Sequence, residues 1–131
     1  MTEASFIRED TAFKLAGSEI LARLDGDSQL LADLCDLLLA ELPRMMDSLK
    51  DAVRIEDANA AHRAAHRLKG SLSVFGAGPH LKACEALEKM ALNCNMSEIP
   101  EILSRLESHL GQFSAAVAAL GKESHARADR G

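Results

Sequence analysis

One stretch of the sequence gathers the residues that could do chemistry. It covers residues 61–91 and reads AHRAAHRLKGSLSVFGAGPHLKACEALEKMA. If the stretch is helical as far as Phe75, a rotation of about 100° per residue places two histidines, a lysine and a serine along one side of the helix. These residues are His62, His66, Lys69 and Ser73. The apolar residues lie about a third of a turn away, so the imidazole of His66 is predicted to project from the flank of the protein as an accessible nucleophile.

Gly70 follows His66 by one turn and is a poor choice for stability. Glycine inside a helix costs about 0.5 to 1 kcal/mol relative to alanine. The missing side chain would let a partner approach the imidazole closely. Lys69 supplies a cation on the same side, able to neutralise the oxygens of a phosphoryl group carried by His66. The pattern therefore indicates an accessible nucleophilic imidazole with a cation at its side.

Basic side chains surround this histidine although the chain as a whole is acidic. The chain has 15 Lys and Arg against 20 Asp and Glu, which gives a net charge of −5. Residues 58–84, however, include four basic residues and no acidic one. Arg63 and Arg67 lie on the side of the helix opposite Lys69. Together with Gly70 and Ser73 they are predicted to contact a partner whose surface is acidic.

Other kinds of site fit parts of the same pattern less well. His62 and His66 have the spacing of a metal pair on one helix face. The lack of carboxylates in residues 58–84 and the neighbouring cations argue against that use. The sequence contains no Walker A pattern and no kinase glycine loop, so autophosphorylation from ATP is not expected. Cys84 is predicted to lie in the core, and the remaining histidines on helix surfaces or in the tail: His80, His109 and His125.

Composition excludes several classes of function. Aromatic residues make up 3% of the chain, with no Trp or Tyr, so base stacking has no platform, and the net negative charge disfavours nucleic acid. The three cysteines form no CxxC pair, which is typical of a reducing compartment. No apolar run approaches 18 residues, and the N-terminus does not resemble a signal peptide. A cytoplasmic protein without membrane contact is therefore expected.

The elements that must position these residues are helices. Four segments repeat apolar residues at steps of three or four, beginning near Ser28, Ala58, Pro79 and Ser97. Their lengths and short connections predict an all-α fold, an antiparallel up-and-down four-helix bundle. One or two short N-terminal helical segments are expected around Phe6, Phe13 and Ile20. The domain is predicted to cover residues 1–121, followed by a polar tail over residues 122–131.

The first long segment raises two further questions. Pro43 sits inside it and is expected to kink the helix or to divide it in two. Beside the main stripe of this segment runs a second apolar line, formed by Cys35, Leu39, Leu42 and Met46. Burial of a wide helix face is the default explanation of this line, and a docking patch for a partner helix is the alternative.

The residues around His66 resemble a known family. The pattern consists of His66, Lys69, Gly70 and Ser71 as H-x-x-K-G-S, then Phe75-Gly76-Ala77, then Leu81, Cys84, Leu87 and Glu88. It resembles the histidine-containing phosphotransfer (HPt) domains of bacterial multistep phosphorelays, and the likeness covers most of residues 20–118. Leu72 departs from the pattern, which usually has a small residue there. Because Leu72 falls on the apolar seam, the departure concerns packing more than chemistry.

The resemblance implies that the chain is a phosphoryl carrier and not an enzyme that turns over a free substrate. His66 would accept a phosphoryl group from the aspartyl phosphate of one receiver domain and pass it to the aspartate of another. Lys69 would neutralise phosphate charge, and Gly70 would give clearance for docking. The other motif residues are assigned structural roles, and among them Gly76 would end the helix in a tight turn: Ser71, Gly76, Ala77 and Glu88.

Partners and cofactors follow from the same resemblance. The receiver would bring the acidic pocket and its Mg²⁺, so the chain is expected to need no cofactor or metal site of its own. The expected partners are receiver domains of a hybrid sensor kinase or a response regulator, and the expected state is a monomer. Two alternatives stay open. One is a bundle that scaffolds or sequesters a response regulator without phosphorylation, and the other is a dimeric phosphoacceptor module of a sensor kinase.

Overall fold

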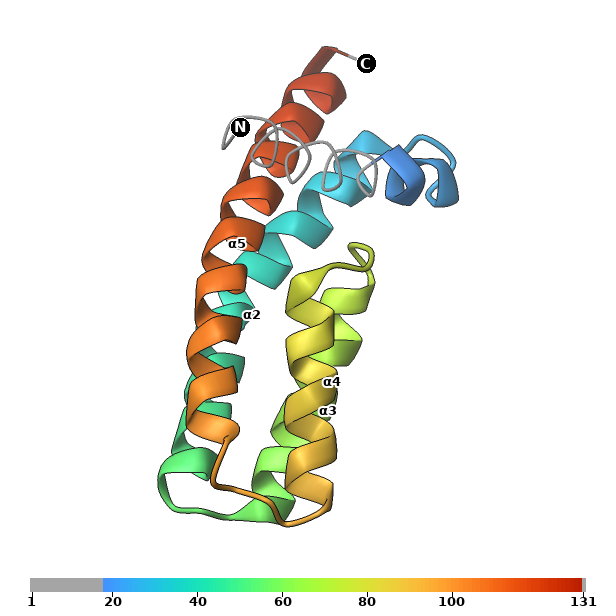
Figure 1. Cartoon of the computed structure of the whole chain (residues 1–131). Helices are drawn as coiled ribbons and strands as arrows, with labels where there is room; N and C mark the ends of the chain where they lie inside the picture. The colour runs from blue at the N-terminus through green and yellow to red at the C-terminus, as the bar shows by residue number, and fades with distance from the viewer. Residues whose placement is uncertain (1–17, 131) are drawn as a thin grey trace, which may run out of the picture.

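The computed structural model describes residues 18–130, which form four main helices packed as a bundle and a short helical segment at residues 18–23 (Figure 1). The main helices are α2 (Ser28–Arg54), α3 (Ala58–Ser73), α4 (Pro79–Leu92) and α5 (Ile99–Arg130). Consecutive main helices run in opposite directions (Figure 1). The predicted all-α bundle with a short N-terminal helix is therefore confirmed. Residues 1–17, which include the expected segment around Phe6 and Phe13, lie outside the described residues.

The helices begin and end where local chemistry favours it. The side chain of Asp27 accepts a hydrogen bond from the backbone N–H of Leu30 at 3.0 Å and caps α2, and Asp57 caps α3 in the same way. Gly76, with a φ of 97°, turns the chain between α3 and α4 in a conformation that other residues adopt at a cost. Pro79 then occupies the first turn of α4, where its missing N–H is harmless.

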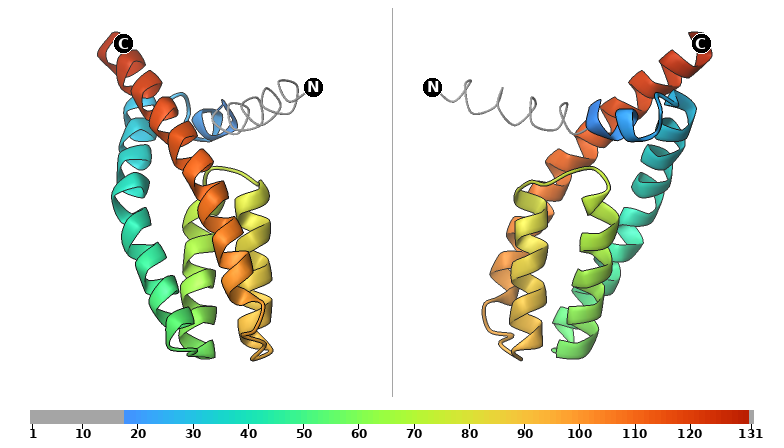
Figure 2. Two further views of the ribbon diagram at one scale, coloured as in Figure 1. Left: turned by 60° about the vertical axis from the view of Figure 1, so that its left-hand side comes forward. Right: turned by 90° about the vertical axis from the view of Figure 1, so that its right-hand side faces the viewer.

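Pro43 does not divide the first long helix. Helix α2 continues through it over 27 residues, and its axis bends gently in Figure 2. A proline inside a helix removes one hydrogen bond, and a curved axis accommodates the ring. The expectation that Pro43 divides the helix in two is therefore wrong, and the helix bends instead.

Each helix packs against its neighbours along the chain, and α2 and α5 close the bundle. This order places α3 diagonally across the bundle from α5. Helices α2 and α5 are much longer than α3 and α4, so they extend together beyond the turn that links α3 to α4 (Figures 1 and 2). The segment 18–23 lies at that end, where Ile20 is buried in the core. No helix of residues 18–130 is long and apolar enough to cross a membrane.

The apolar seam of α3 is buried as predicted, with Ala61, Ala65, Leu68 and Leu72 almost inaccessible. The second apolar line of α2 is also core, because Cys35, Leu42 and Met46 are buried and Leu39 is half-buried. The docking alternative for that line is therefore wrong. The exposed apolar side chains of α2 are instead Leu30 and Leu37.

Helix α5 continues through the segment expected as a polar tail. Residues 122–130 are helical, Ser124 is buried, and Nε2 of His125 lies 3.0 Å from Oδ2 of Asp36. Just before this segment α5 passes close to α2, because a Cβ built on Gly121 would lie 3.2 Å from the Cβ of Cys35. This extension is hard to predict from the sequence, since its contacts join residues that are far apart in the chain.

His80 was expected on a helix surface, and that expectation is wrong. Its side chain is 1% exposed, and its ring packs against Phe113 with the ring centroids 4.4 Å apart. Burial, with a smaller effect from the nearby His109, lowers the pKa of His80 to about 4. Pro79 begins α4 with its first turn against α5, so the residue that follows it points inward.

The buried His80 predicts a pH-dependent stability. Because its pKa is lowered on folding, the unfolded chain binds the proton first as the pH falls from about 6.5 to about 4, and stability is lost in that window. Between pH 7 and pH 4 the free energy of unfolding should fall by on the order of 3 kcal/mol more than in a His80→Leu variant. Urea unfolding of both proteins at the two pH values measures this difference. Parallel loss of stability in the two proteins would contradict it.

Candidate functional site

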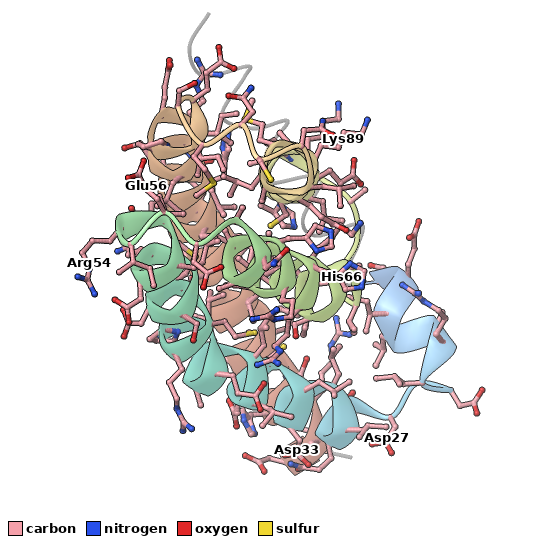
Figure 3. The ribbon with its side chains drawn as sticks, turned by 90° about the horizontal axis from the view of Figure 1, so that it is seen from below. Asp27, Asp33, Arg54, Glu56, His66 and Lys89 are labelled. Atoms are coloured by element: carbon pink, nitrogen blue, oxygen red, sulfur yellow. The ribbon has the colours of Figure 1, made fainter. Side chains whose placement is uncertain are left out.

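His66 lies in the middle of α3 and projects away from the core (Figure 3). Its side chain is 67% exposed, whereas its helix neighbours Ala65 and Leu68 are fully buried. The seam of small and apolar residues fixes which side of α3 faces the bundle, and this leaves the imidazole on the outside. The predicted position of His66 on the flank agrees with the structure.

A carboxylate from the neighbouring helix holds the ring. Nδ1 of His66 lies 2.9 Å from Oε1 of Glu88, which α4 brings alongside α3. The second oxygen of the same carboxylate, Oε2, lies 3.0 Å from Nζ of Lys69. The Glu88 side chain is only 17% exposed, so water competes weakly for these contacts. Glu88, for which a structural role in helix packing is the favoured expectation, is thus in direct contact with both His66 and Lys69.

The contacts among His66, Lys69 and Glu88 favour the charged forms of Glu88 and Lys69. Burial by itself raises the pKa of Glu88, but the hydrogen bonds with His66 and Lys69 outweigh it, and the pKa lies below its ordinary value. The hydrogen bond with Glu88 raises the pKa of Lys69, which remains a cation. The carboxylate is therefore ionised at neutral pH and can only accept hydrogen bonds.

This fixes the state of the neutral imidazole. Because Glu88 can only accept, Nδ1 of His66 must carry the proton and donate it to Oε1. Nε2 of the neutral ring then holds an unshared electron pair. With two thirds of the side chain exposed, that nitrogen is open to a reactant in solution.

His62 borders the same carboxylate. Its ring stacks on that of His66, with the centroids 6.3 Å apart, and its Nε2 lies 3.8 Å from Oε1 of Glu88. Only His66 is close enough to this oxygen for a hydrogen bond, while Lys69 pairs with the other oxygen. Within residues 18–130 no three His, Cys, Asp or Glu side chains are grouped so as to hold a metal ion.

Gly70 and Ser73 occupy the exposed surface of α3 beyond His66. A Cβ built on Gly70 would meet no atom within 4 Å, so nothing inside this molecule requires glycine there. The hydroxyl of Ser73 donates to the backbone carbonyl of Gly70 at 2.8 Å and is used within the helix. Of the motif residues assigned structural roles, Ser71 is half-buried, Gly76 forms the turn and Ala77 is exposed.

Arg63 and Arg67 are exposed on the opposite side of His66 from Lys69. They line a hollow between α3 and α2, together with Arg44 of α2. The structure thus separates these two arginines from Lys69. Lys69 joins the carboxylate on the α4 side, whereas the two arginines face α2. Arg44 was not among the candidate residues, because its place in the sequence is remote from them.

The hydrogen bond to Glu88 predicts a specific tautomer of His66. In ¹⁵N NMR spectra recorded at a pH where the ring is neutral, His66 should be protonated at Nδ1. A Glu88→Ala variant should change to the Nε2–H form that free histidine favours, because the acceptor is gone.

The matched control is Glu85→Ala, which removes the same charge from an exposed position one turn earlier on α4. It should leave the tautomer of His66 unchanged. An Nε2–H ring in the unmodified protein, or an equal change in both variants, would contradict the assignment.

Comparison with known proteins agrees with this geometry. A family model of the Hpt domain matches residues 33–122, a range that includes all of α3 and α4. Searches among curated proteins and among solved structures find no match. Membership of the family implies a phosphotransfer role in a phosphorelay, with receiver domains as partners. With an exposed histidine on the second main helix of a four-helix bundle and a match over most of its length, the chain belongs to the Hpt domain family.

Proposed function

We infer that His66 is the phosphoryl acceptor, and that it takes the phosphoryl group from the aspartyl phosphate of a receiver domain and passes it to the aspartate of another. The observation that carries this proposal is the hydrogen bond of 2.9 Å between Nδ1 of His66 and Glu88. It leaves Nε2 as the nucleophilic nitrogen and keeps it on the exposed side of α3. A histidine on this flank needs no rearrangement of the core to meet a partner.

Transfer of the phosphoryl group to His66 needs no general base, because Nε2 carries no proton that must be removed. The lone pair of Nε2 attacks phosphorus, the bond from phosphorus to the receiver's carboxylate oxygen breaks, and that carboxylate leaves with the electron pair. The ring keeps its proton on Nδ1 and becomes cationic as the new bond forms. The carboxylate of Glu88 faces that proton and stabilises the developing positive charge. In the forward transfer a receiver carboxylate attacks phosphorus, and the electron pair returns to Nε2.

Lys69 has a role on the phosphoryl side. Its ammonium group is held beside the ring by the ion pair of 3.0 Å with Glu88, and its side chain is 31% exposed. A phosphoryl group on Nε2 adds negative oxygens within reach of a cation that is already in place. Positioning and charge neutralisation are the main requirements of phosphoryl transfer, so the receiver's own acidic pocket and divalent cation can supply the rest.

The proposal predicts where a label goes. Receiver domains from the same organism, phosphorylated in the presence of Mg²⁺, should transfer an acid-labile and alkali-stable label to the chain. His66→Gln should abolish labelling, because Gln has no nucleophilic ring nitrogen, and His62→Gln should keep it.

Two outcomes would contradict the assignment. Full labelling of His66→Gln would exclude His66 as the acceptor, and loss of label in His62→Gln alone would move the site by one turn. A receiver that binds the chain tightly but never labels it would favour the scaffold function instead.

The open surface above Gly70 gives a second prediction. Gly70→Ala should stabilise the free protein by about 0.5 to 1 kcal/mol, because the added methyl group meets nothing and alanine favours the helix. Gly70→Leu should leave the fold intact but slow transfer from a receiver about tenfold or more, since displacing a reacting atom by about 1 Å can cost a hundredfold in rate.

Gly111 of α5 is the matched control. It is also exposed, and a Cβ there also meets no atom within 4 Å. Gly111→Ala should stabilise the protein equally, and Gly111→Leu should not slow transfer. Equal transfer rates for the two leucine variants would refute the role of Gly70 in docking.

A further inference from the structure

Three arginines from two helices gather around one hollow beside the His66 site. The hollow has a volume of about 360 Å³ and lies between α2 and α3. Arg44 lines it from α2, and Arg63 and Arg67 line it from α3. Its remaining wall is made of Met45, Ser48, Ala60 and Ala64. We call this feature the arginine groove.

The arginines of the groove are available to a partner. All three are exposed, and none takes part in an ion pair within the described part of the chain. Three arginines elsewhere do form ion pairs: each of Arg54, Arg105 and Arg127 pairs with a carboxylate three or four residues away. Three unpaired guanidinium groups in a chain of net charge −5 form a local attraction for carboxylates.

The groove adjoins the reactive histidine on the side away from Glu88. At about 100° per residue, Arg63 and Arg67 lie about 60° and 100° around α3 from His66, and Lys69 lies about 60° in the other direction. Helix α3 stands between α2 and α4 in Figure 3. A domain that covers Nε2 of His66 therefore also reaches the arginine groove.

Apolar side chains continue the same surface toward the other end of α2. Leu37 lies two turns before Arg44 and is 54% exposed, and Val74 at the end of α3 is 44% exposed. Arginine is enriched in protein–protein contacts, and Leu37 and Val74 add apolar area that a folded protein could cover. A free inorganic anion would contact only the arginines and would leave these apolar side chains uncovered.

We propose that the arginine groove binds acidic side chains on the receiver domain that docks at His66, and that this contact determines which receivers the chain serves. The proposal rests on the proposed function only for the identity of the partner. Guanidinium groups pair with carboxylates in two-point geometry, so a receiver with acidic residues in register gains affinity. A receiver with basic residues there is repelled.

The experiment compares Arg44→Glu with Arg54→Glu. Both variants reverse one exposed arginine of α2, but Arg54 lies at the C-terminal end of the helix and already pairs with Asp51. With a receiver that labels the unmodified chain, Arg44→Glu should lower the second-order rate of transfer and the binding affinity about tenfold at low salt. The loss should shrink at 0.5 M salt, and Arg54→Glu should stay within about twofold of the unmodified chain.

A small phosphodonor separates docking from chemistry. Phosphoramidate, which needs no docking surface, should label His66 at the same rate in both variants and in the unmodified chain. Equal rates of transfer and equal affinities for Arg44→Glu and Arg54→Glu would overturn the proposal that the groove binds the receiver, and would not affect the assignment of His66. So would a loss in Arg44→Glu that salt does not change.

The two proposals can fail separately. If a receiver binds the chain through Arg44 but never labels His66, the groove stands and the phosphoacceptor assignment falls. If a receiver labels His66 and Arg44→Glu has no effect, the phosphoacceptor assignment stands and the proposal on the groove falls. If receivers neither bind nor label the chain, both proposals are overturned.

Discussion

The hydrogen bond between His66 and Glu88 is the contact on which the rest of the site depends. It joins two helices that the short turn at Gly76 folds against each other, and it sets the tautomer of the ring. The same carboxylate holds Lys69, so one partly buried group orients the imidazole and keeps a cation at its side. A carboxylate in this place is stable because two donors repay its burial. Removing it would alter the state of His66 and the position of Lys69 together.

The residues that hold α3 in the bundle are different from those that α3 exposes around His66. The seam of α3 consists of alanine and leucine that are fully buried, and this seam fixes the rotation of the helix to within the width of a side chain. Helices α2 and α5 are long and pack against each other past the end of the α3–α4 pair, where Gly121 lets them approach closely. Because α5 lies diagonally opposite α3, the stabilising contacts of its last turns do not intrude on His66. The exposed side of α3 that carries His66 can therefore stay open without a cost to the core.

Much of this arrangement could be predicted from the sequence, because helical periodicity determines which residues face inward. The periodicity of residues 58–75 predicted both the seam and the exposed position of His66. Glu88 was harder, since its significance depends on the pairing of two helices. Residues equally distant from the centre of an antiparallel turn lie level with each other, and a turn at residues 76–78 makes position 88 the partner of position 66. Counting charges along residues 58–84 missed this carboxylate, because it arrives from the next helix. His80 and the α5 extension were missed for a similar reason, since their partners Phe113 and Asp36 are remote in the chain.

Different helices contact the two sides of α3, and this affects which parts of the surface can change independently of the contact between His66 and Glu88. On one side, α4 supplies the carboxylate that contacts His66, and this contact is short and partly buried. On the other side, α2 supplies Arg44 and the exposed Leu30 and Leu37, which lie outside the core and away from the imidazole. Partner choice resides in differences between affinities, which exposed charges change readily. If the arginine groove selects the receiver as proposed, substitutions on the exposed face of α2 would redirect the chain toward another receiver and leave the contact between His66 and Glu88 in place, because two different helices flank α3.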